Sequence, residues 1–311
     1  MKQVPVQLSL RERARLWLDE PQPIARLAFL RVAIPLIVIG FLSSRLVHAD
    51  DWLSAVGFRV PYLGGNDWRQ PLYLPAVSVP VAWAVAVALV LAGTCLAAGL
   101  FTRPAAGLFT FLLVYVALAD RLEAFTVSKL APMLSLALLV SPSGARYGID
   151  AWRQSRRQPE TSPPTHVSGG VMRFFQTLVV VMYSGAGIAK LRGGWLSSEV
   201  LWSHLHDDYQ TSVAWLLIRM CPHGAWQGFQ ILTLVFEVGA PLWFVLPWTR
   251  RPALYVGLGM HAMIGLMFGP VVWFALLMSV LLIGCFARSF NRQSAGRSPG
   301  GATPGLGTAR R

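Results

Sequence analysis

Residues Met172 to Trp195 read MRFFQTLVVVMYSGAGIAKLRGGW, and this stretch decides the fold of the chain. It begins as an apolar run of helix length and ends in Tyr183-Ser-Gly-Ala-Gly-Ile-Ala-Lys190-Leu, followed shortly by Trp195. An apolar segment of roughly 20 residues can cross a bilayer. A lysine at the end of such a helix is costly, and ionisable groups at membrane depth are functional-site hypotheses by default. Lys190 is therefore either a reactive group or an anchor whose ammonium reaches the headgroups.

The composition of the whole chain agrees with this interpretation. Its 311 residues are 54% hydrophobic and 13% charged, whereas a soluble domain carries about 25% charged residues. The formal net charge of +13 could suggest a nucleic-acid partner. The basic residues lie mostly between the apolar runs, however, so we expect no nucleic acid and take the lipid bilayer as the partner.

The apolar runs predict an all-α, polytopic membrane bundle of about eight transmembrane helices. Two segments rich in Trp and Tyr, 48–76 and 191–223, are expected to lie along the outer interface and roof part of the bundle. The predicted spans are 26–47, 77–100, 104–120, 125–141, 172–190, 224–247, 252–269 and 270–287.

The positions of Lys and Arg predict the orientation. They concentrate in the segments on the same side as the N-terminus, so both termini are expected in the cytoplasm. We divide the chain into a polar cytoplasmic lead (1–23), a transmembrane domain (24–288) and a disordered basic tail (289–311). The expected location is the inner membrane of a bacterium.

Several polar side chains fall near one depth. With a helical rise of about 1.5 Å per residue, Tyr183, Glu237, His261 and Lys129 lie roughly 14–18 Å from the inner ends of their helices. Lys190 lies roughly 10 Å further out. We therefore expect Lys190 at the outer mouth of a cavity lined by the others, and no tight catalytic triad.

Glu237 is the strongest single candidate. Pro241, four residues on, removes the hydrogen bond to the Glu237 backbone carbonyl, so carbonyl and carboxyl together could accept a cation or a proton donor. Alternatively, Lys129 pairs with Glu237 and locks the bundle, because a buried charge needs a partner.

Small residues accompany the other two candidates. Tyr183 shares a helical face with Gly187 and Lys190. His261 has Gly257 and Gly265 four residues to either side, a groove for another helix or a flat ligand. No further ligand stands four residues from His261, so no metal site is predicted.

These motifs together resemble the HTTM domain family, whose members are bacterial membrane relatives of the vitamin K-dependent gamma-carboxylase. The resemblance covers about residues 24–287 and rests on Tyr183, Lys190-Leu and Trp195, on Phe236-Glu237 with Pro241, on His261, and on the RLAFLR opening of the first span. It implies that Lys190 is the base that deprotonates a reduced quinone on the outer side. Residues 120–125, DRLEAF, lack the histidine that the family has before the fourth helix. The carboxylase also holds its protein substrate in a large lumenal domain. For both reasons we do not expect carboxylation of a protein glutamate.

Two hypotheses follow from these observations. The first is an enzyme that acts from the outer face on a quinone or lipid-like substrate, with Lys190 as base, Tyr183 as orienting hydroxyl, and Glu237 and His261 as proton relay. Contacts to the quinone are expected at Gly187, Trp195, Gly257 and Gly265. The second is a non-catalytic transport, toxin-maturation or complex-partner protein with a structural Lys129–Glu237 ion pair.

Overall fold

The computed structural model describes residues 9–57, 74–119, 126–196, 199–206 and 210–287. The predicted disordered tail, the region 120–125 and the centre of the first roofing segment lie outside these residues.

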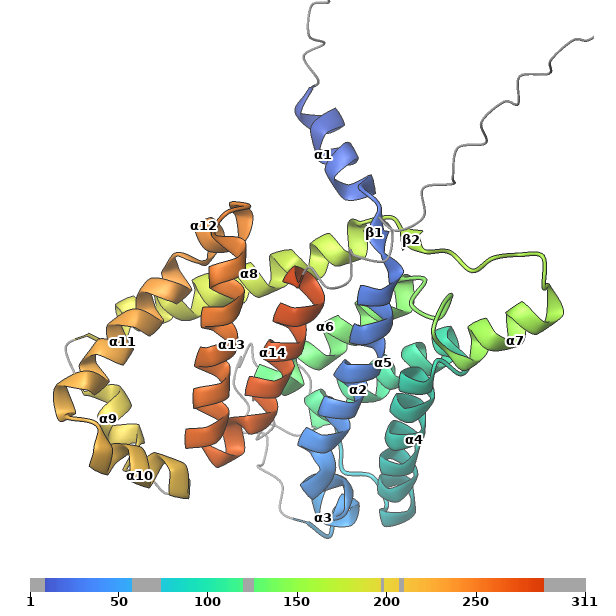
Figure 1. Ribbon diagram of the computed structural model, residues 1–311. Coiled ribbons are helices and arrows are strands. Elements are labelled where there is room, and N and C mark those ends of the chain that lie inside the picture. Colours follow the sequence, from blue (N-terminus) through green and yellow to red (C-terminus); the bar gives the residue numbers. More distant parts are fainter. Residues whose placement is uncertain (1–8, 58–73, 120–125, 197–198, 207–209, 288–311) are drawn as a thin grey trace, which may run out of the picture.

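Helices make up most of the described chain (Figure 1). Among the described residues, one pair of two-residue strands, β1 (Gln22–Pro23) and β2 (His166–Val167), joins the lead to the segment before α8 in antiparallel register. The helices are α1 (Leu10–Asp19), α2 (Ile24–Leu46), α3 (Ala49–Leu53), α4 (Val79–Ala98), α5 (Thr102–Ala119), α6 (Thr126–Val140), α7 (Ile149–Arg157), α8 (Gly170–Arg192), α9 (Val200–His204), α10 (Ser212–Met220), α11 (His223–Val238), α12 (Ala240–Val245), α13 (Arg250–Met267) and α14 (Val272–Phe286), with a 3₁₀ turn at Gly269–Val271.

Each of the eight predicted spans is helical, which confirms the all-α membrane fold. Among the described residues, five helices are long and apolar enough to cross a membrane: α2, α4, α5, α8 and the stretch Gly269–Phe286. The run predicted as 224–247 is divided into α11 and α12 at Gly239. Pro241 in the first turn of α12 has no N–H to donate to the preceding turn, which favours the division at this point. How many helices cross the membrane stays a prediction.

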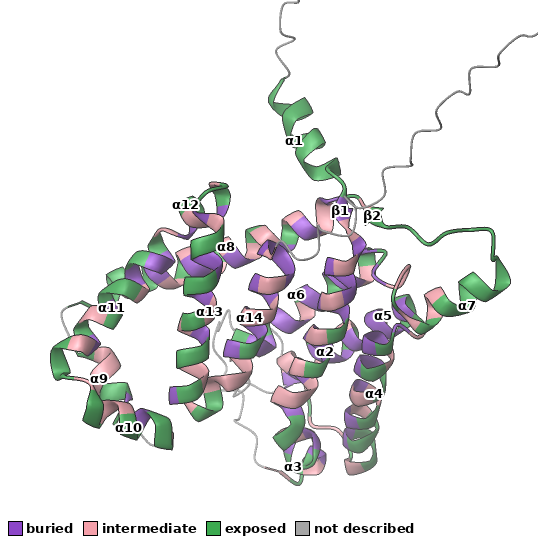
Figure 2. Cartoon of the chain, in the orientation of Figure 1, coloured by how far each residue is buried: buried purple, intermediate pink, exposed green. Residues whose placement is uncertain are grey.

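The core lies where α2 meets its neighbours. Leu27, Leu30, Ile34 and Val38 of α2 are buried, and α2 packs on α4, α6 and α14. Helix α14 also packs on α8 and α13, so it joins the group formed by α2, α4, α5 and α6 to the helices that follow. In contrast, α1 and α7 bury none of their residues (Figure 2).

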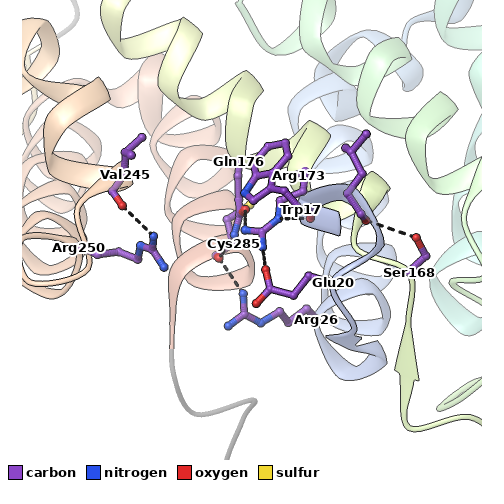
Figure 3. Close-up of polar contacts among 10 residues, drawn as sticks. Trp17, Glu20, Arg26, Ser168, Arg173, Gln176, Val245, Arg250 and Cys285 are labelled. Atoms are coloured by element: carbon purple, nitrogen blue, oxygen red, sulfur yellow. Dashed lines mark hydrogen bonds and ion pairs between the residues drawn. The ribbon is translucent and has the colours of Figure 1, made fainter. Parts of the chain in front are cut away.

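One end of the bundle gathers arginines, and we call it the basic end (Figure 3). There Arg26 donates to the carbonyl of Cys285 (2.8 Å), Arg173 pairs with Glu20, and Arg250 donates to two carbonyls at the end of α12. The contact between Arg26 and Cys285 places the start of α2 beside the end of α14. The transmembrane region therefore begins and ends on one side, while the assignment of that side to the cytoplasm stays a prediction.

Candidate functional site

The centre of the candidate site is an ion pair between α8 and α11. Lys190 Nζ donates to both carboxylate oxygens of Glu237, at 2.7 Å each. The Glu237 side chain is only 8% exposed, whereas that of Lys190 is 23% exposed. The carboxylate is therefore enclosed by protein, and the ammonium lies at the edge of the site.

A close crossing of the two helices brings these residues together. A Cβ atom added at Gly187 would lie 2.8 Å from Val238 Cγ2 and 2.9 Å from the Val238 backbone nitrogen. Gly187 thus lets α8 lie against the backbone of α11, one residue from Glu237. The predicted separation of Lys190 from Glu237 is wrong, because depth counted along single helices ignores how they cross and how far a lysine side chain reaches.

Lys129 is not the partner of Glu237. It lies on α6 with an exposed side chain, and α6 packs on α2, α5, α8 and α14. The predicted Lys129–Glu237 ion pair is therefore wrong, and Lys190 fills that role. A buried carboxylate requires a cation, but the sequence offered two lysines and no means of choosing between them.

Trp195 covers the ion pair from the segment that follows α8. The Lys190 ammonium lies 5.1 Å from the centre of its ring, a cation–π distance. The Trp195 indole nitrogen donates to the carbonyl of Gln230 (2.9 Å), and the Gln230 amide donates back to the carbonyl of Trp195. Gln230 lies two turns from Glu237 on the same face of α11, so these reciprocal bonds hold the tryptophan over the ion pair.

Tyr183 and His261 form a second polar couple. Their hydroxyl and Nε2 atoms are 2.7 Å apart in a buried hydrogen bond. The Tyr183 ring stacks on Phe244 at 5.9 Å and meets Phe236 edge to face at 5.1 Å. Within the described chain, His261 Nδ1 has no hydrogen-bond partner. Phe236, which contacts the Tyr183 ring, directly precedes Glu237, which pairs with Lys190. Neighbouring residues of α11 therefore contact the Tyr183–His261 couple and form the ion pair.

The glycines beside His261 serve helix packing. A Cβ atom at Gly257 would lie 2.9 Å from Leu282 Cδ1 and 3.1 Å from Phe236 Cζ, and one at Gly265 would lie 3.2 Å from Ala275 Cβ. The groove was predicted to receive either another helix or a flat ligand, and in the structure neighbouring helices pack against both glycines. Contact of these glycines with a ligand stays a prediction.

An apolar cavity of about 290 Å³ lies between α11 and α13. Thr233 is the residue in its lining with a side-chain hydroxyl, and it stands one turn from Glu237 on the same face of α11. Sequence reasoning missed this cavity, because apolar residues in an apolar span give no signal of their own. The remaining lining residues are Leu201, Trp226, Phe229, Leu232, Phe236, Val256, Gly259, Met260, Met263, Ile264, Met267 and Phe268.

The fold and the site together define a helical membrane protein with a charged pair between two of its helices. A scan against protein-family models matches the HTTM domain over residues 20–287. The chain belongs to the HTTM domain family, which confirms the resemblance seen in the sequence. Searches of curated proteins and of solved structures found no match.

Proposed function

We propose that this HTTM-domain protein is a membrane enzyme in which Lys190, supported by Glu237, removes a proton from an acidic hydroxyl of a lipid-soluble substrate. A reduced quinone is the candidate substrate. The observation that carries the proposal is the cation–carboxylate pair at 2.7 Å, covered by Trp195. Ionisable residues of this kind inside a membrane domain commonly mark reaction or transport paths.

The geometry suits proton transfer. A proton that moves from Lys190 Nζ to a Glu237 oxygen leaves a neutral amine beside a neutral carboxyl, and an apolar environment favours neutral groups. The neutral amine can then accept the proton of the substrate hydroxyl. The ammonium formed in this way stands next to the substrate anion and balances its charge.

The other candidate residues have supporting roles in the proposal. Tyr183 orients the substrate through its hydroxyl, and its hydrogen bond to His261 provides a relay away from the site. The cavity between α11 and α13 fits an apolar ring or chain, because its lining is apolar apart from Thr233 and the indole nitrogen of Trp226. The excess of Lys and Arg at the basic end supports an inner-membrane location with this end in the cytoplasm.

A structural role for the ion pair is the second candidate. Both oxygens of Glu237 are engaged by Lys190, and Gly187 fixes the crossing of α8 and α11 beside them. In that case the protein is a non-catalytic transport, toxin-maturation or complex-partner protein, and the ion pair locks two helices.

One experiment separates the two candidates. The wild type, Lys190→Met and the exchange Lys190→Glu/Glu237→Lys are purified in nanodiscs and mixed with a reduced short-chain quinone. Absorption of the quinol anion is followed against pH, and native mass spectrometry reports what is bound. We expect the wild type to bind the quinol and form the anion at a lower pH than free quinol does.

The variants give the discriminating results. Lys190→Met should bind quinol without lowering the pH at which the anion forms. The exchange should restore thermal stability but not anion formation. Equal anion formation by wild type and Lys190→Met, or retention of phospholipid alone by the wild type, would rule out the enzyme.

A further inference from the structure

A second, polar hollow lies at the basic end, away from the Lys190–Glu237 pair. Its volume is about 430 Å³, and it lies between α7 and the turn that joins α4 to α5. The lining residues are Phe101, Asp150, Arg153, Gln154, Arg157 and Gln158. Neither the proposed proton transfer nor the packing of the bundle uses this hollow.

The hollow carries net positive charge. Arg153 and Arg157 line it with exposed side chains. Asp150 is the carboxylate in its lining, and that carboxylate is already used: it accepts from the backbone nitrogens of Phe101 (3.0 Å) and Thr102 (2.8 Å) and from the Thr102 hydroxyl (2.8 Å). An anion that enters the hollow therefore meets two guanidinium groups and a carboxylate turned toward the helix that it caps.

The backbone around the hollow is fixed. Arg31 is buried, and it donates to the carbonyls of Ser143 (2.8 Å) and Tyr147 (2.6 Å), which precede α7. The backbone nitrogen of Asp150 donates to the carbonyl of Gly99 (2.8 Å) in the turn after α4. These bonds hold the start of α7 beside the ends of α4 and α5.

We expect that location at the level of the lipid headgroups, because α4 ends and α5 begins there, and both are long and apolar enough to cross a membrane. From there α7 extends sideways from the bundle (Figure 1). Three aromatic side chains around it are more than half exposed: Phe101 at 62%, Tyr147 at 53% and Trp152 at 54%. Aromatic rings favour the membrane–water interface, and a helix with one apolar and one basic face lies in that plane.

We propose that this hollow binds the phosphate of an anionic phospholipid headgroup, with Arg153 and Arg157 as its ligands. Arginine binds phosphate oxygens through paired N–H groups, and its planar fork suits a phosphodiester. The aromatic side chains beside the hollow contact the acyl–headgroup boundary of the same leaflet. The site is independent of the chemistry at Lys190.

The test uses the full chain in nanodiscs of two compositions, phosphatidylcholine alone and phosphatidylcholine with phosphatidylglycerol. Hydrogen exchange is measured on the peptides that cover residues 149–158. We expect slower exchange in the anionic discs for the wild type. Each arginine removed should weaken the apparent affinity for phosphatidylglycerol about fivefold.

Two variants make the result specific. Arg153→Gln/Arg157→Gln should lose the protection while keeping its thermal stability, since both side chains are exposed. Arg219→Gln, which removes an exposed arginine at the other end of the molecule, should keep the protection. Equal exchange of the wild type in both discs, or an equal loss in the Arg219 variant, would overturn the proposal.

Two further arms identify the source of the anion. Inorganic phosphate added to phosphatidylcholine discs should not slow exchange, and equal protection by phosphate would refute a lipid site. Native mass spectrometry of the wild type should retain phosphatidylglycerol in preference to phosphatidylcholine. Protection that develops only with an added acidic peptide would point to a protein partner and count against the lipid.

Discussion

Replacing Lys190 with Met tests how the Lys190–Glu237 pair is held. The substitution keeps the apolar stem and leaves the Glu237 carboxylate, 8% exposed, without its cation. Removing one partner of a buried ion pair costs about 3–5 kcal/mol. Because the Lys190 side chain is 23% exposed, the ion pair is only partly enclosed by protein, and we expect the lower value, about 3 kcal/mol, in the free energy of unfolding.

The reverse substitution, Glu237→Gln, should cost less. The remaining ammonium can turn toward the headgroups and still faces the ring of Trp195, so we expect about 1 kcal/mol. In Lys190→Met/Glu237→Gln no unpaired charge remains, and replacing a whole pair is often nearly neutral. The double variant should therefore be more stable than Lys190→Met alone, with a coupling energy of about 4 kcal/mol, close to the sum of the two single costs.

The assay is reversible unfolding of the purified variants in mixed micelles, followed by far-ultraviolet circular dichroism at fixed pH and lipid content. A matched control is Lys129→Met, which removes an exposed lysine that does not contact Glu237 and should cost little. Equal costs for the two single variants, together with additivity in the double variant, would refute the pairing and the asymmetry derived from burial.

Three further perturbations test other parts of the structure. Gly187→Ala should cost about 1–3 kcal/mol by thermal unfolding, because its Cβ would lie 2.8 Å from Val238 Cγ2; Gly185→Ala, with no atom within 4 Å, is the control and should not destabilise. Tyr183→Phe should cost about 1–3 kcal/mol, since it leaves a buried imidazole nitrogen unpaired; an unchanged melting temperature would contradict that bond. Asp150→Asn should destabilise at pH 7 by about 0.5–2 kcal/mol. Burial raises the pKa of Asp150, but the hydrogen bonds from Thr102 and Phe101 outweigh it and hold that pKa below the ordinary 3.8. A lowered pKa stabilises the fold at pH values above 3.8, and this contribution is lost as the pH falls through the lowered pKa. The difference in melting temperature between the wild type and the variant should therefore close in acid.

The sequence predicted the helices well because a membrane span is a local property of composition. Every apolar run of sufficient length became a helix, and the one that was divided, between α11 and α12, contains Pro241. The polar candidates were also visible, since Lys190, Glu237, Tyr183 and His261 are conspicuous in apolar surroundings.

The pairing among those candidates could not be predicted. It depends on how α8 and α11 cross, and the crossing depends on contacts between residues far apart in the chain, such as Gly187 and Val238. Depth along one helix gave the wrong partner for Glu237 but brought Tyr183 and His261 to one level, where they do meet. The cavity between α11 and α13 is likewise a product of helix placement.

The order of Lys190 and Glu237 in the chain has a consequence for biosynthesis. They are 47 residues apart, with the lysine first. At 5–20 residues per second, the ribosome delivers Glu237 about 2–9 s after Lys190. The carboxylate, the more enclosed of the two charges, is therefore synthesised after its cation, and α11 can pack against α8 as an ion-paired neighbour as soon as it forms.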